Sequence, residues 1–176
     1  MIEVGGETEG TEPSPPARTA SPVACVLGDT DLVRPLGLAG IRCAVVSRPH
    51  SPKAYSRFVD ARIDWADNWA DAEHMRANLL AFAAEQPVAP ALFYQYDGDL
   101  LFVSHHREVL AERFRFAIAD AELIEQLVDK TRFRELAAER GLPVPATAVV
   151  WPAAEGGPPD LPLEFPVILN RSPAAT

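Results

Sequence analysis

The sequence between residues 23 and 47, VACVLGDTDLVRPLGLAGIRCAVVS, decides the expected fold. Residues 23–28 form a short apolar run that ends in glycine, and residues 41–47 form a second apolar run. Runs of this kind are typical of strands buried on both faces of a parallel sheet. Residues 29–40 carry apolar side chains at helical spacing between the two runs. This order predicts a right-handed strand–helix–strand unit.

Two residues fit the helix expected over 29–40. Pro35 fits early in a helix, where the missing N–H of proline costs little. Gly40 fits at the end of the helix, because glycine readily adopts the left-handed conformation that often follows the last turn.

The alternation of strands and helices continues along the chain, and it predicts an α/β protein with an open parallel Rossmann-like sheet and flanking helices. Asp71 is placed to cap the helix that follows it. A loop is expected over 48–58. Further strands are expected over 59–65, 89–97 and 114–120, and further helices over 71–86 and 98–113.

From residue 121 the pattern changes to a helical segment with a break in it. Asp129 is expected to interrupt this segment and to cap a second helix that begins near Lys130. Short apolar runs then predict strands over 144–151 and 165–170. We expect these elements to be a fragment of a second, α+β domain.

The N-terminal residues, the length of the apolar runs and the two cysteines indicate the cellular location to expect. Residues 1–21 are rich in Pro, Gly, Ser, Thr and Glu and lack the apolar core of a signal peptide, so we expect a disordered tail. No apolar run reaches the ~18–20 residues that span a bilayer. Cys25 and Cys43 each lie in an apolar run, which is typical of reduced core thiols in a cytoplasmic protein.

The net charge of −9 argues against a nucleic-acid partner, which needs a clustered basic surface. It does not argue against small anionic ligands, because a few local cations are enough to bind them. No CxxC motif or Cys/His cluster indicates a metal site, so we assign no metal ligand.

The carboxyl ends of the expected strands carry the candidate substrate-binding residues, since ligands of open α/β sheets bind there. Asp29, Thr30 and Asp31 follow the first strand, Arg48 follows the second, and Asp97 follows the fourth. Each also has a simpler interpretation. Asp29 and Asp31 fit helix caps, Arg48 fits a solvated loop arginine, and the sequence DGD around Asp97 fits a turn.

The loop after the first strand disfavours a dinucleotide site. It has one glycine where the pattern G-x-G-x-x-G needs three, and Asp29 and Asp31 would repel a pyrophosphate. His105 and His106 are adjacent in an expected helix, so both should not point into one site, and we assign them no role.

Several motifs together resemble one family. The segment LVDKTRFRELAAERGLPVPAT (127–147), followed by FPVILN (165–170), resembles the start of the nucleotide-binding domain of ATP-grasp ligases. GDTDLVRPLGLAGI, AYSRFVD and FYQYDGDLLFVSHHR further resemble the carboxylate–amine ligase subgroup, which includes D-aspartate ligase-like enzymes. The resemblance implies a preATP-grasp domain over 22–120 and the start of a truncated ATP-grasp domain over 121–176.

The resemblance also implies a chemistry. In this family ATP and Mg²⁺ convert a carboxylate into an acylphosphate, and an amine displaces the phosphate to form an amide. Lys130 matches the family's DK lysine, which implies that it contacts the nucleotide. Asn170 stands where the family has a second lysine, and the sequence ends where most of the nucleotide site would follow. We therefore expect the fragment alone to be inactive and to bind neither ATP nor Mg²⁺ tightly, and we assign no catalytic residue.

The expected partners are small carboxylate and amine substrates, and neither nucleic acid nor a membrane is expected as a partner. A homodimer is one possible assembly. A stand-alone Rossmann-like module that binds a small metabolite through Asp29, Arg48 and Asp97 is the alternative function. A nucleotide-dependent oxidoreductase is a third, weaker interpretation.

Overall fold

The structure is a computed structural model that describes residues 21–148, 163–164 and 166–168. Nearly all of the expected disordered tail therefore lies outside the described residues. No described helix has the length and apolar character that a bilayer span requires.

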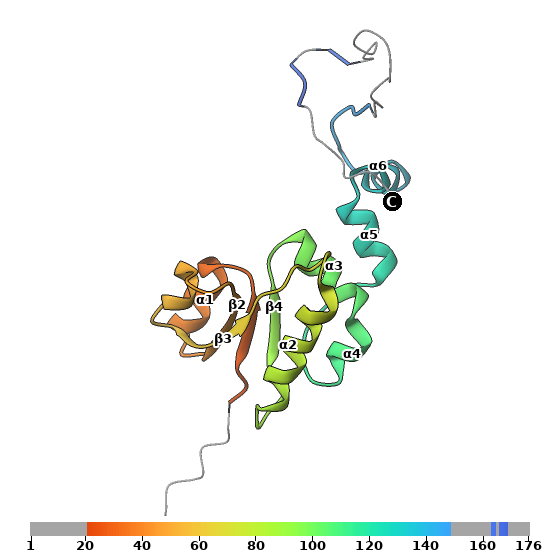
Figure 1. Ribbon diagram of the computed structural model, residues 1–176. Coiled ribbons are helices and arrows are strands. Elements are labelled where there is room, and N and C mark those ends of the chain that lie inside the picture. The colour runs from red at the N-terminus through yellow and green to blue at the C-terminus, as the bar shows by residue number, and fades with distance from the viewer. Residues whose placement is uncertain (1–20, 149–162, 165, 169–176) are drawn as a thin grey trace, which may run out of the picture.

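A four-stranded parallel sheet with the order β3-β2-β1-β4 forms the centre of the fold (Figure 1). In the register, Val26 of β1 lies beside Val45 of β2 on one side and Phe93 of β4 on the other. The expected open parallel sheet is confirmed. The strands are β1 (Ala24–Leu27), β2 (Cys43–Ser47), β3 (Val59–Asp64) and β4 (Ala91–Tyr94).

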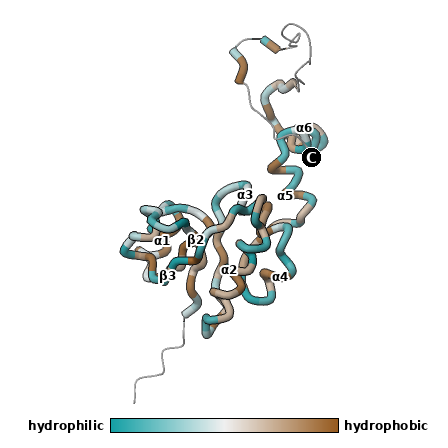
Figure 2. The backbone as a smooth tube through the Cα atoms, in the orientation of Figure 1, coloured by the Kyte–Doolittle hydropathy of each residue, from teal (hydrophilic) through white to brown (hydrophobic). Residues whose placement is uncertain are grey.

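Successive residues of β1 and β2 pack into two separate cores on opposite faces of the sheet. Ala24 and Val26 face α1 (Thr30–Leu38) and the 3-10 helix η1 (Pro52–Tyr55). Cys25 and Leu27 face the other core, to which three helices contribute. Figure 2 shows that the helices mix apolar and polar residues along their length, and that β3 at the edge of the sheet is more polar than the central strands. The three helices are α2 (Ala72–Ala84), α3 (Asp97–His105) and α4 (Arg107–Ala111).

The ends of α1 follow from local chemistry. The Asp29 carboxylate accepts the Thr30 N–H at 2.7 Å, and Gly40 has a φ of 76°. The Ile41 N–H reaches back to the Leu36 carbonyl at 3.0 Å, which completes the glycine-terminated helix end. The expected role of Gly40 is confirmed. Pro35, in contrast, lies inside α1 rather than in its first turn.

The strand expected over 114–120 is wrong. One isolated bridge joins Arg115 to Ala91, with the Arg115 N–H donating to the Pro90 carbonyl at 2.8 Å. Beyond the bridge, the Ala117 carbonyl accepts the Tyr94 hydroxyl at 2.6 Å, so a side chain takes the place of a ladder bond.

Other boundaries also differ from expectation. The helix expected over 98–113 is two helices, because the backbone at His106 leaves α-helical geometry. Asp71 precedes α2 without capping it, since its carboxylate lies 3.1 Å from Nδ1 of His74. Residues 142–148 and 166–168 form no strand, and the remainder of the two strands expected there lies outside the described residues.

The helical segment after the sheet breaks where the sequence predicted. Helix α5 (Ala121–Val128) ends at Asp129, and α6 (Lys130–Glu139) begins directly after it. The Asp129 carboxylate accepts the N–H groups of Thr131 at 2.8 Å and Arg132 at 2.9 Å, so it caps α6. Helix α5 packs against α3, and α6 lies beyond α5 (Figure 1).

Two helical glycines make a matched test of packing. A Cβ at Gly37 would lie 2.3 Å from Cγ of Phe58, whereas a Cβ at Gly98 has its nearest neighbour, Nε1 of Trp69, at 3.6 Å. Gly37→Ala should destabilise the fold by about 1–3 kcal/mol through overpacking. Gly98→Ala should stabilise it by about 0.5–1 kcal/mol. Urea unfolding measures both, and equal effects would contradict the packing of α1.

The cap at Asp129 gives a second prediction. Asp129→Ala removes the acceptor for two α6 N–H groups and should cost about 1 kcal/mol, with faster amide exchange confined to the first turn of α6. Asp129→Asn keeps an acceptor oxygen and should stay close to wild type. Unchanged exchange in the alanine variant would show that packing alone holds the helix start.

Candidate functional site

The carboxyl ends of the strands bring most of the predicted residues to one edge of the sheet. Strand order reverses between β1 and β4, and open α/β sheets bind ligands at such a point. Asp29 and Thr30 follow β1, Arg48 follows β2, and Asp97 opens α3 after β4. The structure thus places these residues near the strand ends, with Asp31 in the first turn of α1, and their binding roles stay predictions.

The ends of β1 and β4 are joined by Gln95. Its side-chain oxygen Oε1 accepts the Asp29 N–H at 2.8 Å. A Cβ on Gly28 would lie 2.8 Å from that same oxygen, so a larger residue at position 28 would have to displace the Gln95 oxygen. The Gly28 carbonyl accepts Nζ of Lys53 at 2.6 Å. Lys53 belongs to η1, and the loop between β2 and β3 therefore reaches the same place.

Asp99 lies on the other side of Gln95. Its carboxylate accepts Nδ2 of Asn68 at 2.7 Å and the Tyr96 N–H at 3.4 Å. Burial raises the pKa of Asp99, while these hydrogen bonds and the charge of Lys53 act in the opposite direction. The other amide atom of Asn68, Oδ1, is buried and has no hydrogen-bond partner among the described residues.

Some predicted residues keep the simpler role within this edge. The Asp29 carboxylate caps α1, and Asp31 is exposed in the first turn of that helix. Arg48 is exposed, and its guanidinium lies 3.8 Å from the centre of the Trp65 ring. Asp97 is exposed in the first turn of α3.

Lys130 does not join the residues at the strand ends. It is exposed at the first position of α6, and it forms no ion pair within the part of the chain that the structure describes. Helix α5 lies between α6 and α3. Two helices thus separate Lys130 from the sheet edge, and its nucleotide contact stays a prediction.

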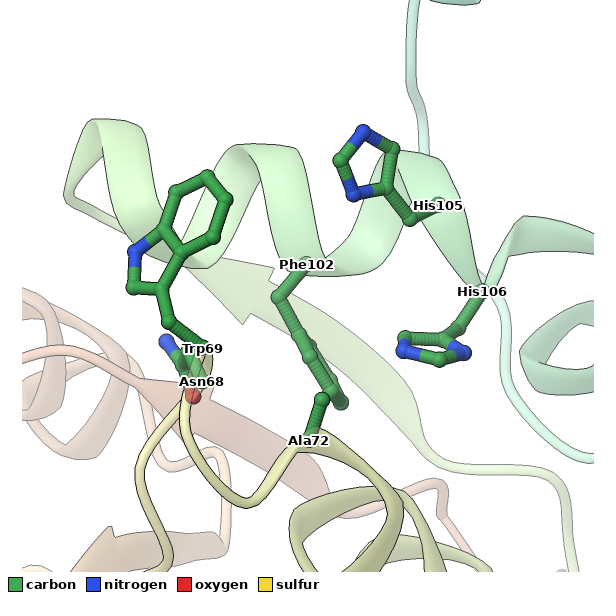
Figure 3. A pocket seen from close by; sticks show the side chains of 6 residues that line it. All are labelled: Asn68, Trp69, Ala72, Phe102, His105 and His106. Carbon is green, nitrogen blue, oxygen red and sulfur yellow. The ribbon is translucent and has the colours of Figure 1, made fainter. Parts of the chain in front are cut away.

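A second, small hollow of about 170 Å³ lies between α3 and the start of α2 (Figure 3). His105 lies edge-on to Trp69, and the His106 ring tilts over Phe102, with ring centres 6.5 and 4.8 Å apart. Burial lowers the pKa of His106 and favours its neutral form. The lining residues are Asn68, Trp69, Ala72, Phe102, His105 and His106.

Both histidines border this hollow, but their rings lie on different sides of it, that of His105 beside Trp69 and that of His106 beside Phe102 (Figure 3). The His106 N–H still donates to the Phe102 carbonyl at 3.1 Å, as in a helix, so neighbouring side chains still diverge.

Sequence reasoning missed Lys53, Gln95 and Asn68 as parts of the site, and it left Asp99, which follows the fourth strand together with Asp97, without a role. Each lies in a loop or at a helix start, and their contacts join segments far apart in the chain. One signal was present for Lys53. It and Lys130 are the only lysines in a sequence whose other side-chain cations are arginines or histidines.

No group of three or more His, Cys, Asp or Glu residues suited to a metal ion occurs among the described residues. No protein-family model matches the chain. A D-aspartate ligase of Enterococcus faecium (strain Aus0004) is 37% identical over 77 residues, which are 42% of this chain and 18% of that protein.

Two solved structures share the fold. An L-amino acid ligase from Bacillus licheniformis matches 77% of this chain and 36% of its own, with a TM-score of 0.54 and 13% identity. The biotin carboxylase domain of a single-chain bacterial carboxylase matches 74% of this chain and 31% of its own, with a TM-score of 0.52 and 20% identity. The chain thus spans well under half the length of each relative, and it is similar to the N-terminal part of ATP-grasp ligases of the carboxylate–amine type.

Proposed function

We propose that the chain is the N-terminal part of an ATP-dependent ligase that joins an amino-acid substrate to a second substrate through an amide bond. The 37% identity with a D-aspartate ligase carries the proposal. The parallel sheet followed by the α5–α6 pair supports it, because the fold matches that of an L-amino acid ligase. Within this proposal, residues 22–120 form the substrate-holding domain and residues 121–176 begin the ATP-grasp domain.

Bound ATP would supply the phosphoryl group that turns a substrate carboxylate into an acylphosphate, from which an amine displaces phosphate. This chain's own contribution begins with holding the substrates at the strand ends. Arg48 can grip a carboxylate through two N–H groups. Asp29, Thr30, Asp31 and Asp97 can accept hydrogen bonds from an amine or a hydroxyl.

Lys130 suits a nucleotide contact. Its ammonium is an exposed point charge at the positive end of α6, and it has no ion-pair partner in the described segments. The Asp129 carboxylate holds the first turn of α6 and so fixes where the lysine stem begins. The described residues do not fit a Mg²⁺ site, and we assign no step of the reaction to a metal bound by them.

The proposal includes a cytoplasmic location, where ATP is available. Cys25 and Cys43 support it, because both are free and buried and need no oxidising compartment. Burial also raises the pKa of the Cys25 thiol, which keeps it protonated and unreactive.

A turnover assay tests whether the 176-residue chain can carry out the reaction by itself. Incubated with ATP, Mg²⁺, D-aspartate and hydroxylamine, the chain alone should give neither ADP nor the hydroxamate that traps an acylphosphate. The physical reason is that the described residues include no group of carboxylates suited to hold the metal. Magnesium-dependent formation of either product, above the level of a Lys130→Gln preparation, would contradict the proposal that residues outside this chain complete the site.

The role of Lys130 has its own test. Lysine labelled with ¹³C at Cε gives one NMR signal each for Lys53 and Lys130, and Lys130→Arg assigns them. Millimolar Mg·ATP should move the Lys130 signal and leave that of Lys53 in place, because a phosphate next to the ammonium changes its field. AMP, with fewer phosphate charges, should move it less. If the Lys130 signal stays in place at the highest soluble concentration of Mg·ATP, the proposed contact between Lys130 and the nucleotide is rejected.

A further inference from the structure

Lys53 places a partly buried positive charge where β1 ends. Its ammonium has three N–H donors, and one of them is used by the Gly28 carbonyl at 2.6 Å. Among the residues that the structure describes, no carboxylate forms an ion pair with it. Two donors of Lys53 therefore remain available at the sheet edge.

Asp99 places a partly buried negative charge at the start of α3. Asn68 and the Tyr96 N–H fix the carboxylate from two directions. The charge of Lys53 acts to lower the pKa of Asp99, against the effect of burial, and the two side chains form no ion pair within the described part of the chain. Asp99 and Lys53 thus bring opposite charges to the ends of β4 and β1.

The connection between the two groups is short and rigid. Gly28, which holds Lys53, touches the Gln95 side chain, and Gln95 lies in the same turn as the N–H that binds Asp99. The rest of this edge carries three exposed acids, Asp29, Asp31 and Asp97, and the exposed cation Arg48, which lies over the Trp65 ring. A simple anion would be repelled by the acids, and a simple cation would be repelled by Lys53.

We propose that Lys53 and Asp99 together bind an α-amino acid, with the ligand carboxylate on Lys53 and the ligand ammonium on Asp99. An α-amino acid carries its ammonium and its carboxylate on one carbon atom, so it can offer a negative group to Lys53 and a positive group to Asp99 at the same time. The inference rests on the proposed function for the choice of an amino acid among zwitterions. It identifies Lys53 and Asp99 as binding residues that the sequence motifs did not reveal.

The experiment uses the 176-residue chain with ¹³C-labelled lysine and no nucleotide. D-aspartate, L-aspartate and L-alanine are titrated while the Lys53 signal is followed. At least one of them should move the Lys53 signal saturably and leave Lys130 in place. If none moves it, the proposal fails.

Variants and truncated ligands separate the two charges. Calorimetry of each variant should show that Lys53→Gln and Asp99→Asn each weaken amino-acid binding at least tenfold. Succinate, which lacks the ammonium, should bind no worse to Asp99→Asn than to wild type. Lys53→Arg keeps a positive charge beside the Gly28 carbonyl and should keep the affinity within a few-fold of wild type. This variant distinguishes binding by the charge of Lys53 from a role in holding the loop alone.

The exposed ion pair of Arg42 and Asp60 supplies matched controls. It lies where β2 and β3 begin, at the edge of the sheet away from the proposed site. Arg42→Gln and Asp60→Asn remove the same charges and should leave binding unchanged. Equal affinity in Lys53→Gln, Asp99→Asn and these controls would overturn the proposal. The amino-acid titration contains no nucleotide, so it is independent of the separate Mg·ATP titration. Amino-acid binding together with a Lys130 signal that Mg·ATP leaves in place would keep this inference and remove the proposed nucleotide contact of Lys130. A Lys130 signal that moves under Mg·ATP without any amino-acid binding would do the opposite.

Discussion

The hydrogen bond between the Asp29 N–H and the Gln95 side chain is the contact on which the candidate site depends. It joins the ends of β1 and β4, the strands between which the sheet order reverses. A Cβ at position 28 would crowd the Gln95 oxygen that makes this bond, and the Gly28 carbonyl accepts Nζ of Lys53. Three segments far apart in the sequence are thereby locked at one place, while the two-sided burial of β1 and β2 keeps the place rigid.

The parallel sheet and the α5–α6 pair could be predicted from the sequence because both depend on local patterns. Apolar runs at β1 and β2 are buried throughout, as parallel strands covered on both faces must be. Gly40 ends α1, and Asp129 caps α6, through bonds to neighbours within a few residues. Where the cause of a structure lies within one turn of the chain, the residue type alone predicts it.

The failures have long-range causes. The run at 114–120 is apolar enough for a strand, but it pairs with β4 only at Arg115, and the Ala117 carbonyl accepts the Tyr94 hydroxyl. Lys53 lies in a loop without periodicity, and only the fold brings it to Gly28, 25 residues away in sequence. Asp99 meets Asn68 across 31 residues for the same reason. No spacing rule reveals contacts of this kind.

The central claim is that ligands bind where the ends of β1 and β4 are joined. Amide hydrogen exchange of the whole chain, with and without saturating D-aspartate, tests it directly. The account predicts slower exchange at residues 28–33 and 95–100, the two segments that meet through Gln95, with the remaining described amides unchanged. Protection confined to the hollow around Trp69 and His106, or no protection at either segment, would contradict it.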